Sequence, residues 1–518
     1  MVTSAYLVSV VGTCWLRNNF IDGNAFRDVW NKRASEELNK RLNLQQNNNV
    51  AKNIVMFMGD GMGIPTVTGA RIYKGQMAGN SGEETVLSFE EFPYVGLAKT
   101  YNTDRQVPDS AATATAIFTG VKTRFGLVAL PPPVMNASLF NTVVGNGLSI
   151  SFLSSGKSVA LVTTSRLTHA TPSAAYAHSP ERWWEKDDKV PKACRGRVAD
   201  VASQFVTNAK DFDVVFAGGR KYFIPNSESD PEYPEKIGGR TDGRNLIKEW
   251  EADKAGRNLT YKYVWRKKEF DQLEAGNYDR VLGLFDYDHM NYEGDRATDK
   301  AGEPSLVEMT EYAVKQLERN PNGYFLFVEG ARIDHGHHMN LGKHALNEMV
   351  MMERSAELAL SRASVDDTLF LVTGDHGHVM TVGGWASRGN PLFGTFDNMP
   401  YTTIMYQNGP SGISPGTRKN LSESFSFRQQ SMVPLNVAAH GADDVPVYAH
   451  GPMAHLFHGV YEQNYILHAM TYASCMDNSK KHCKERAKEA KLMTSGGATL
   501  YVTLTSHCLV LLFLSAFH

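Results

Sequence analysis

Two short segments of the chain combine aspartate with several histidines. One segment reads Asp334-His335-Gly336-His337-His338, and the other reads Asp375-His376-Gly377-His378. Carboxylates and imidazoles are ligands that zinc accepts, and a catalytic zinc keeps one position open for water or substrate. A single histidine is more often a surface or structural residue. Two such clusters, each following an apolar run, indicate a metal site.

Acidic residues also mark the ends of three apolar runs that have strand composition. Asp60, Glu329 and Asp375 each follow such a run. In open α/β sheets, ligands bind beyond the carboxyl ends of the parallel strands. We therefore expect the three carboxylates to converge on one site.

Asp375 and His376 can serve the same ion only if the chain has already left the strand. Adjacent side chains in a strand point to opposite faces of the sheet. Gly374 and Gly377 flank this pair. Because glycine tolerates backbone conformations that other residues avoid, we expect the two glycines to permit the turn.

A candidate nucleophile lies in the segment Pro108-Asp109-Ser110-Ala111-Ala112-Thr113. Helix-forming sequence follows, which places Ser110 near a helix N-terminus, where backbone amides favour an anion. Taken alone, Asp109 and Ser110 could simply be an N-cap pair. The chain has no convincing Gly-x-Ser-x-Gly signature of a Ser-His-Asp triad. Activation of the Ser110 hydroxyl by a metal is the sharper hypothesis.

The elements that must position these residues are alternating strands and helices. This alternation predicts a three-layer α/β/α sandwich with a central, mostly parallel sheet and inserted surface segments. Strands are expected at 53–58, 158–163, 213–217, 324–328 and 368–373, and helices at 305–320 and 343–364. The irregular stretch of about 383–437 is expected to be an insertion near the site or a dimer interface.

Composition excludes several other classes of protein. The 518 residues include 53 basic and 55 acidic side chains, so the formal net charge of −2 disfavours a nucleic-acid-binding role. With 42% hydrophobic and 21% charged residues, the chain can bury a sizeable core. A folded globular protein is expected.

Four segments, in order along the chain, resemble the alkaline phosphatase family, most closely its animal, lipid-anchored members. They are 60–63, 108–113, 328–338 and 373–376. The segment around Glu329 is highly specific on its own. The resemblance implies an enzyme that hydrolyses small phosphate monoesters through a phosphoserine intermediate, with broad selectivity for the alcohol. It also implies a homodimer.

The resemblance implies a role for each matching position. Ser110 would be the nucleophile and Arg182 would clamp the phosphate, since a planar guanidinium can engage two oxygens at once. Two Zn²⁺ and one Mg²⁺ would be bound. One zinc would be held by Asp60, Asp375 and His376, the other zinc by Asp334, His338 and His440, and magnesium by Asp60, Thr171 and Glu329. Asp109, His169 and His335 would lie around these ligands.

A calcium site is a further implication of the resemblance. Its ligands would be Glu232, the backbone carbonyl of Phe285, Asp286 and Glu303. Ligands that are all oxygen atoms suit a hard cation. A solvated acidic surface is the alternative interpretation.

The two ends of the chain predict its destination. Residues 1–20 contain an apolar run typical of a signal peptide, although an apolar N-terminal strand is an alternative. Small residues at Ser495, Gly496 and Gly497, a spacer and a short apolar tail match a glycosylphosphatidylinositol (GPI) attachment signal, with 496–518 removed. A buried terminal strand is the alternative there. The phosphatase domain would span 21–495 and lie on the extracellular face of the plasma membrane, after passage through the secretory pathway.

Glycosylation and a disulfide would fit that compartment. Asn136, Asn258 and Asn420 are in Asn-x-Ser/Thr tripeptides. Cys475 and Cys483 close a short polar loop, so they are candidates for a local disulfide. Cys194 has no obvious partner.

Two other functions compete with the phosphatase hypothesis. A GPI-anchored surface receptor could retain the fold without activity, but every expected catalytic position holds a competent residue. A related phosphodiesterase or sulfatase would use a different nucleophile in different surroundings. The segments around Arg182 and His440 argue against that class.

Overall fold

The computed structural model describes residues 23–132, 148–394, 402–412, 424–476 and 483. The chain divides into a unit of residues 1–46 and a unit of residues 47–518. The first unit contains helix α1 (Gly23–Leu42), whose described side chains are exposed. The site residues and all other described elements belong to the second unit.

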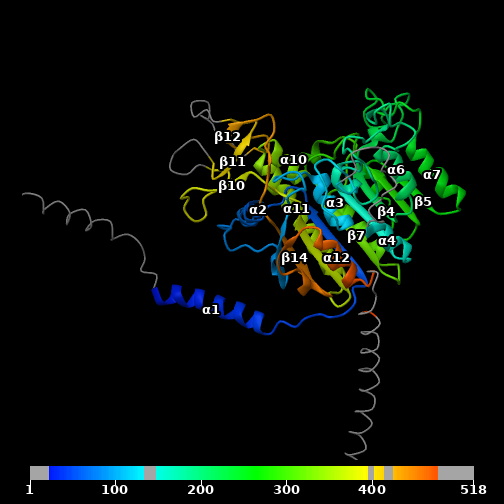
Figure 1. Ribbon diagram of the computed structural model, residues 1–518. Coiled ribbons are helices and arrows are strands. Elements are labelled where there is room, and N and C mark those ends of the chain that lie inside the picture. The colour runs from blue at the N-terminus through cyan, green and yellow to red at the C-terminus, as the bar shows by residue number, and fades with distance from the viewer. Residues whose placement is uncertain (1–22, 133–147, 395–401, 413–423, 477–482, 484–518) are drawn as a thin grey trace, which may run out of the picture. The chain divides into compact units, whose positions relative to one another are not determined.

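The centre of the second unit is a ten-stranded sheet in the order β15-β2-β14-β8-β1-β7-β3-β4-β6-β5 (Figure 1). Its strands are β1 (Asn53–Gly59), β2 (Tyr94–Lys99), β3 (Ser158–Arg166), β4 (Val214–Gly218), β5 (Tyr261–Val264), β6 (Arg280–Leu284), β7 (Tyr324–Gly330), β8 (Thr368–Gly374), β14 (Val445–His450) and β15 (Gly459–Glu462). Within this sheet, β14 pairs antiparallel with β8 and β2, and the other pairs are parallel.

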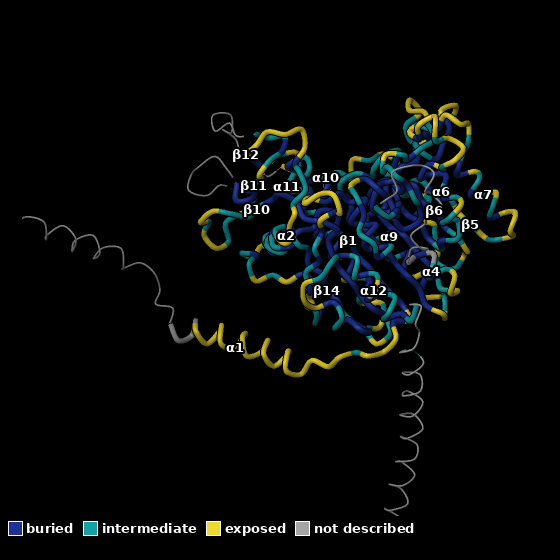
Figure 2. The backbone as a smooth tube through the Cα atoms, in the orientation of Figure 1, coloured by how far each residue is buried: buried dark blue, intermediate teal, exposed yellow. Residues whose placement is uncertain are grey.

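Helices cover both faces of the sheet. Side chains alternate along each strand, so Met56 of β1 packs into one core and Phe57 into the other. The first core receives α3 (Ser110–Thr119), α4 (Leu148–Ser154), α6 (Val201–Asn208), α7 (Leu246–Gly256) and α12 (Tyr465–Ala473); the second receives α2 (Ile64–Met77), α9 (Leu306–Leu317) and α11 (Gly342–Arg362). The buried strands lie between these layers (Figure 2). The predicted α/β/α sandwich is confirmed.

Shorter elements connect the layers. They are the α-helices α5 (Ala170–Ser173), α8 (Lys267–Phe270) and α10 (Arg332–His338), and the 3₁₀ helices η1 (Ser88–Glu91), η3 (Asp187–Lys189), η4 (Arg220–Tyr222), η5 (Arg296–Thr298) and η7 (Ala454–Phe457). Strands β10 (Met380–Val382), β11 (Ile404–Gly409) and β12 (Ser431–Pro434) form a separate small sheet, which lies largely within the stretch expected to be an insertion. Strands β9 (Gly377–His378) and β13 (His440–Gly441) pair antiparallel.

The five predicted strands correspond to β1, β3, β4, β7 and β8, with ends shifted by at most three residues. The two predicted helices correspond to α9 and α11. Ser305 is the N-cap of α9: its hydroxyl accepts a hydrogen bond from the Glu308 amide, and the Glu308 carboxylate accepts one from the Ser305 amide.

Several predictions concern residues near the chain ends or in surface loops. The proposed signal and anchor segments, with Ser495, Gly496 and Gly497, lie outside the described residues, as do Asn136 and Asn420. Asn258 is exposed in a turn after α7. Cys475 and Cys483 form the predicted disulfide, whereas Cys194 is a free cysteine. Among the helices that the structure describes, none has both the length and the apolarity needed to cross a membrane.

Candidate active site

Three neighbouring parallel strands deliver the acidic residues to one edge of the sheet. Strand β1 lies between β8 and β7, with Met58 opposite both Thr373 and Glu329. Asp60 and Asp375 come directly after β1 and β8, and Glu329 is the penultimate residue of β7. The three carboxylates are fully buried at this edge. The predicted convergence follows from the parallel register.

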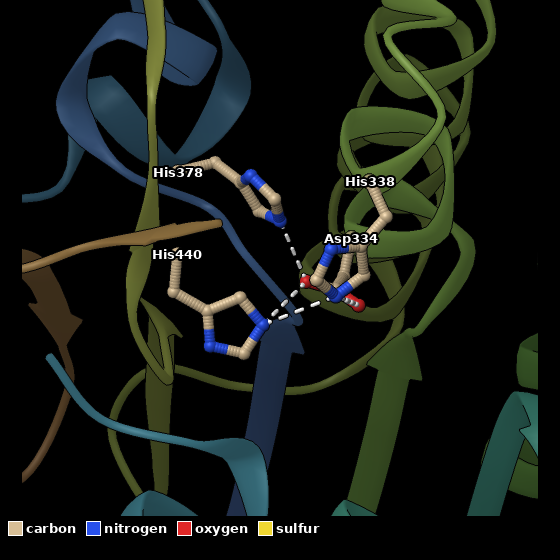
Figure 3. A group of neighbouring side chains, drawn as sticks. All are labelled: Asp334, His338, His378 and His440. Carbon is tan, nitrogen blue, oxygen red and sulfur yellow. Dashed lines mark hydrogen bonds and ion pairs between the residues drawn. The ribbon is translucent and has the colours of Figure 1, made fainter. Parts of the chain in front are cut away.

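A second group of side chains comes from α10 and the β9-β13 pair. Asp334 and His338 lie one turn apart on α10, so they share a face of that helix. His378 of β9 is directly opposite His440 of β13. Figure 3 shows the four side chains pointing toward one another.

The Asp334 carboxylate is the centre of this four-residue group. Its Oδ1 lies 2.9 Å from His378 Nε2 and 3.4 Å from His440 Nε2, and its Oδ2 lies 3.2 Å from His338 Nε2. Burial raises the pKa of Asp334. Ion pairing and hydrogen bonding with the histidines outweigh that effect and hold the pKa well below its usual range. Asp334 is therefore an ionised ligand candidate.

The Asp334 carboxylate and the Ala438 carbonyl raise the pKa of His338 despite its burial, so a proton on this ring can pair with Asp334 in the absence of a cation. In the neutral forms of His338 and His440, by contrast, two ring nitrogens face each other without a proton to share. His338 Nδ1 lies 2.6 Å from the Ala438 carbonyl oxygen, and His440 Nδ1 lies 2.8 Å from that of Pro108. A carbonyl accepts only from a donor, so in each neutral ring the proton is on Nδ1. The two Nε2 atoms, 3.1 Å apart, then both present lone pairs. A cation between these rings and Asp334 fits this donor set.

The Ser110 hydroxyl lies in an adjacent group of polar side chains. Ser110 Oγ is 3.1 Å from His376 Nε2 and 3.3 Å from Asp60 Oδ1. His376 Nε2 is 3.4 Å from Asp60 Oδ1 and 3.3 Å from Asp375 Oδ2. Burial lowers the pKa of His376 well below its usual value, which keeps the ring neutral. One carboxylate and one neutral imidazole thus contact the serine oxygen, and the Asp375 carboxylate contacts the same imidazole.

Gly374 and Gly377, beside Asp375, provide space for neighbouring segments rather than an unusual backbone conformation. Neither Gly374 nor Gly377 has the left-handed backbone that only glycine adopts readily. Both are needed for space, because a Cβ on Gly374 would lie 2.4 Å from the Met62 carbonyl oxygen and one on Gly377 would lie 2.4 Å from the Asp443 carboxylate. The chain does leave the strand at Asp375, because β8 ends at Gly374. A left-handed glycine near the site is Gly61, after β1, with φ +73°.

A third group of oxygen atoms surrounds Glu329. Glu329 Oε2 accepts hydrogen bonds from Thr163 and Ser165, whereas Glu329 Oε1 and Asp60 Oδ2 are buried without a hydrogen-bond partner. Thr171 is fully buried nearby. Burial raises the pKa of Glu329 to about 8, although hydrogen bonds from Thr163 and Ser165 lower it. Buried oxygens that lack donors suit a hard cation.

Electrostatics favours cations at this edge of the sheet. Burial, with repulsion from Asp375, Asp334 and Glu329, raises the pKa of Asp60 well above its usual range. Burial also raises the pKa of Asp375 to about 6. Leaving a buried charge without its partner costs about 3–5 kcal/mol in other proteins. Divalent ions bound to these carboxylates would offset this cost.

Ser110 is the first residue of α3, so its backbone lies among the free amides of the helix N-terminus. Asp109 occupies the N-cap position, but its carboxylate makes no cap hydrogen bond. Instead, Asp109 Oδ2 lies 3.1 Å from Arg182 Nη1, and Oδ1 accepts from the Gly126 amide. The alternative of a simple N-cap pair is therefore wrong for Asp109, which holds Arg182 beside Ser110.

One cavity of about 700 Å³ connects these residues to the surface. Eight of the predicted site residues line this cavity: Asp109, Ser110, His169, Arg182, Asp334, His335, His338 and His440. Arg166 and His289 also line the cavity, although no role was predicted for either. His289 joins His169 and His335 in a cluster whose ligand atoms lie within 4.8 Å of one another. His378 belongs to one of the two clusters that indicated a metal site, but its place in the Asp334 group was not predicted.

The residues of the expected calcium site lie apart from this cavity. Glu232 Oε1 and Glu303 Oε2 are buried without a hydrogen-bond partner. Asp286 Oδ1 accepts a hydrogen bond from the Asp288 amide. Burial raises the pKa of Glu303 to about 8, with repulsion from Asp286 and Asp299 adding to this effect. Among the described residues, these carboxylates do not form a group of three with ligand atoms within 4.8 Å.

Sequence comparison defines the family. The model of the family described as "Alkaline phosphatase" matches residues 51–476. The chain therefore belongs to the alkaline phosphatase family, whose members are metal-dependent phosphoric monoester hydrolases.

Particular relatives are animal enzymes. The tissue-nonspecific isozyme of alkaline phosphatase from Gallus gallus is 47% identical over 90% of this chain and 93% of that protein. The Homo sapiens isozyme is 44% identical over 97% of this chain and 98% of its own length. An alkaline phosphatase from Gadus morhua is 46% identical over 87% of this chain and 98% of its own length.

Solved structures share the fold. The alkaline phosphatase of Thermus thermophilus has a TM-score of 0.60 at 22% identity, covering 86% of this chain and 97% of that structure. The alkaline phosphatase of the Antarctic bacterium TAB5 has a TM-score of 0.58 at 21% identity, and the match covers 83% of this chain and 100% of that structure.

Proposed function

We propose that this phosphatase hydrolyses phosphate monoesters through a phosphoserine intermediate at Ser110. The observation that carries the proposal is the position of Ser110 Oγ, 3.1 Å from His376 Nε2 and 3.3 Å from Asp60 Oδ1, at the start of α3. Arg182 lines the same cavity, where its guanidinium would bind the phosphate.

The proposal includes three metal sites. Two zinc sites would be formed by Asp60, Asp375 and His376, and by Asp334, His338 and His440. Asp60 and His376 cluster with Asp334, Asp375 contacts His376, and Asp334, His338 and His440 cluster together with His378. One magnesium site would be formed by Asp60, Thr171 and Glu329, each of which has a buried oxygen without a hydrogen-bond partner. When bound, these ions would supply Lewis-acid chemistry, which lowers the pKa of a hydroxyl and neutralises charge on phosphate oxygens. His378 would orient Asp334 through its hydrogen bond.

The remaining steps, phosphate binding and nucleophilic attack, would be performed by groups of the protein. Amides at the start of α3 and the Arg182 guanidinium would bind phosphate oxygens, and Asp109 and His169 would hold Arg182 in place. Ser110 Oγ would attack phosphorus, forming the Oγ–P bond as the alcohol leaves. Water would then cleave that bond, releasing inorganic phosphate and restoring the serine hydroxyl.

The direct test is release of inorganic phosphate from a chromogenic phosphate monoester by the purified protein at pH 7 and pH 10. Activity should be higher at pH 10, because burial raises the pKa of Glu329 to about 8, so protons compete with metal for this carboxylate at pH 7 but not at pH 10. Absence of phosphate release at either pH, with zinc and magnesium supplied, would overturn the proposal.

A calcium ion at Glu232, Phe285, Asp286 and Glu303 should stabilise the protein more in alkali than in acid. Burial raises the folded-state pKa values of Glu232 and Glu303 to about 7 and about 8, above the usual glutamate value of 4.5. Without calcium, stability therefore falls as the pH rises through this window. Calcium must displace protons at pH 6 but not at pH 9. The calcium-dependent rise in Tm should be larger at pH 9.

Differential scanning calorimetry with zinc and magnesium held constant measures this effect. Glu303→Gln should remove the calcium-dependent rise, whereas Glu235→Gln, at an exposed neighbouring position, should keep it. An equal rise at both pH values, or none, would contradict the calcium site.

We also propose that the chain forms a homodimer through the segment 383–437. This segment carries four exposed apolar side chains, those of Trp385, Met432, Val433 and Leu435. Exposed apolar side chains that gather on a surface mark protein interfaces. Sedimentation velocity should give a dimer for the wild type and a monomer for the Met432→Asp, Leu435→Asp variant. A monomeric wild type would refute this arrangement.

The proposed location is the extracellular face of the plasma membrane, reached by secretion and held by a GPI anchor near Ser495. The disulfide between Cys475 and Cys483 supports an oxidising compartment. A phosphatidylinositol-specific phospholipase should release the activity from intact cells expressing the full chain. Activity that stays with the cells after complete lipase treatment would argue against the anchor.

A further inference from the structure

The mouth of the catalytic cavity is lined by exposed apolar side chains. Val107, Phe125, Trp183 and Val437 all line the cavity that contains Ser110. Trp183 is 57% exposed and Phe125 is 45% exposed. Exposed apolar side chains that gather at a pocket mark a ligand-binding surface. We call these four residues the rim.

The segments that carry the proposed catalytic groups also hold the rim. Trp183 directly follows Arg182, and Val107 and Val437 each lie three residues before Ser110 and His440. The part of a substrate that extends outward from the phosphate therefore meets the rim. The cavity volume of about 700 Å³ leaves room for such a group beyond a bound phosphate.

Two cations lie against the aromatic rings of the rim. The Arg105 guanidinium carbon is 4.8 Å from the centre of the Phe125 ring, and that of Arg182 is 5.2 Å from the Trp183 ring. These contacts hold the rings while leaving much of each exposed. Exposed aromatic rings beside arginines are the surface on which nucleobases stack.

Given the proposed phosphatase function, we infer that the rim selects phosphate monoesters whose alcohol carries a planar aromatic ring, as nucleoside monophosphates do. The base would stack on Trp183 and Phe125 while its 5′-phosphate occupies the Ser110 and Arg182 site. Aliphatic phosphates would gain only the phosphate contacts. The rim thus adds selectivity for the leaving alcohol to a site that recognises the phosphoryl group.

Adenosine 5′-monophosphate and ribose 5-phosphate test this inference, because they share a primary phosphate ester and differ by the base. The measured quantity is the ratio of their kcat/KM values in the metal-loaded full-length protein. We expect wild type to favour the nucleotide. Trp183→Ala should lower the ratio about tenfold, the scale of one lost base-stacking contact, and Trp183→Phe should keep most of it.

Ile237→Ala is the matched control, because Ile237 is exposed to a similar degree, 54%, and does not line the cavity. Its ratio should equal that of wild type. A wild-type ratio near one, or an unchanged ratio in the Trp183→Ala, Phe125→Ala double variant, would overturn the inference while leaving the proposed function intact. Failure of wild type to hydrolyse either substrate would instead overturn the proposed function, and the inference with it.

Discussion

Replacing Ser110 by alanine should lower kcat for phosphate monoester hydrolysis by about four orders of magnitude or more, the scale seen when other enzymes lose their nucleophile. The change removes the oxygen that would form the bond to phosphorus. Arg182 and the amides of α3 remain, so phosphate should still bind. Steady-state kinetics and the inhibition constant for inorganic phosphate measure the two effects separately.

Ser355→Ala is the matched control for this variant. Ser355 is buried like Ser110, but its hydroxyl donates to the Met351 carbonyl within α11, outside the catalytic cavity. This variant should keep wild-type kinetics. Undiminished turnover in Ser110→Ala would eliminate the phosphoserine pathway, since the remaining cavity residues would then suffice for hydrolysis.

Removal of divalent metals should have the second largest effect. A chelator should lower kcat/KM by at least about 100-fold, because Asp60, Asp334, Asp375 and their histidine neighbours would no longer hold cations beside Ser110. Zinc with magnesium should restore activity, and calcium alone should not. Undiminished kcat/KM in protein shown by elemental analysis to be free of zinc would contradict the proposed metal sites.

Asp334→Asn tests the same sites without a chelator. The amide keeps the shape of the side chain but removes the charge that three histidines face, so zinc content and activity should fall together. Asp295→Asn is the control, because Asp295 makes a similar contact of 3.4 Å with His344 but is 48% exposed and lies outside the cavity.

Much of the fold and the convergence of acidic residues could be predicted from local sequence. The strands around Asp60, Glu329 and Asp375 are continuous apolar runs, which is the pattern of parallel strands buried on both faces. Once these strands are adjacent and parallel, their carboxyl ends must meet. The placement of Ser110 at a helix start followed from small helix-forming residues after it.

Other parts depend on contacts between distant segments, which local patterns do not reveal. His378 lies opposite His440 because β9 pairs with β13, and these strands are two residues each. The antiparallel strand β14 between β8 and β2 has no distinguishing composition. Arg166 and His289 face the cavity from β3 and a loop after β6, where isolated polar residues carry no spacing signal.

The roles of Gly374 and Gly377 could not be predicted for the same reason. Their sequence suggested a turn, but each is required by a close approach from Met62 or Asp443, far along the chain. A glycine that provides space for a distant segment is identical in sequence to one that provides a left-handed turn. Only the packed structure shows which of these two roles a glycine has.

Mass spectrometry of the enzyme, quenched in acid while it hydrolyses a phosphate monoester, tests the central claim most directly. The expected result is one phosphoryl group on the peptide that contains Ser110, and none on that peptide in Ser110→Ala. Continued turnover with no phosphoryl group on this peptide, or with the group on another residue, would contradict nucleophilic catalysis by Ser110.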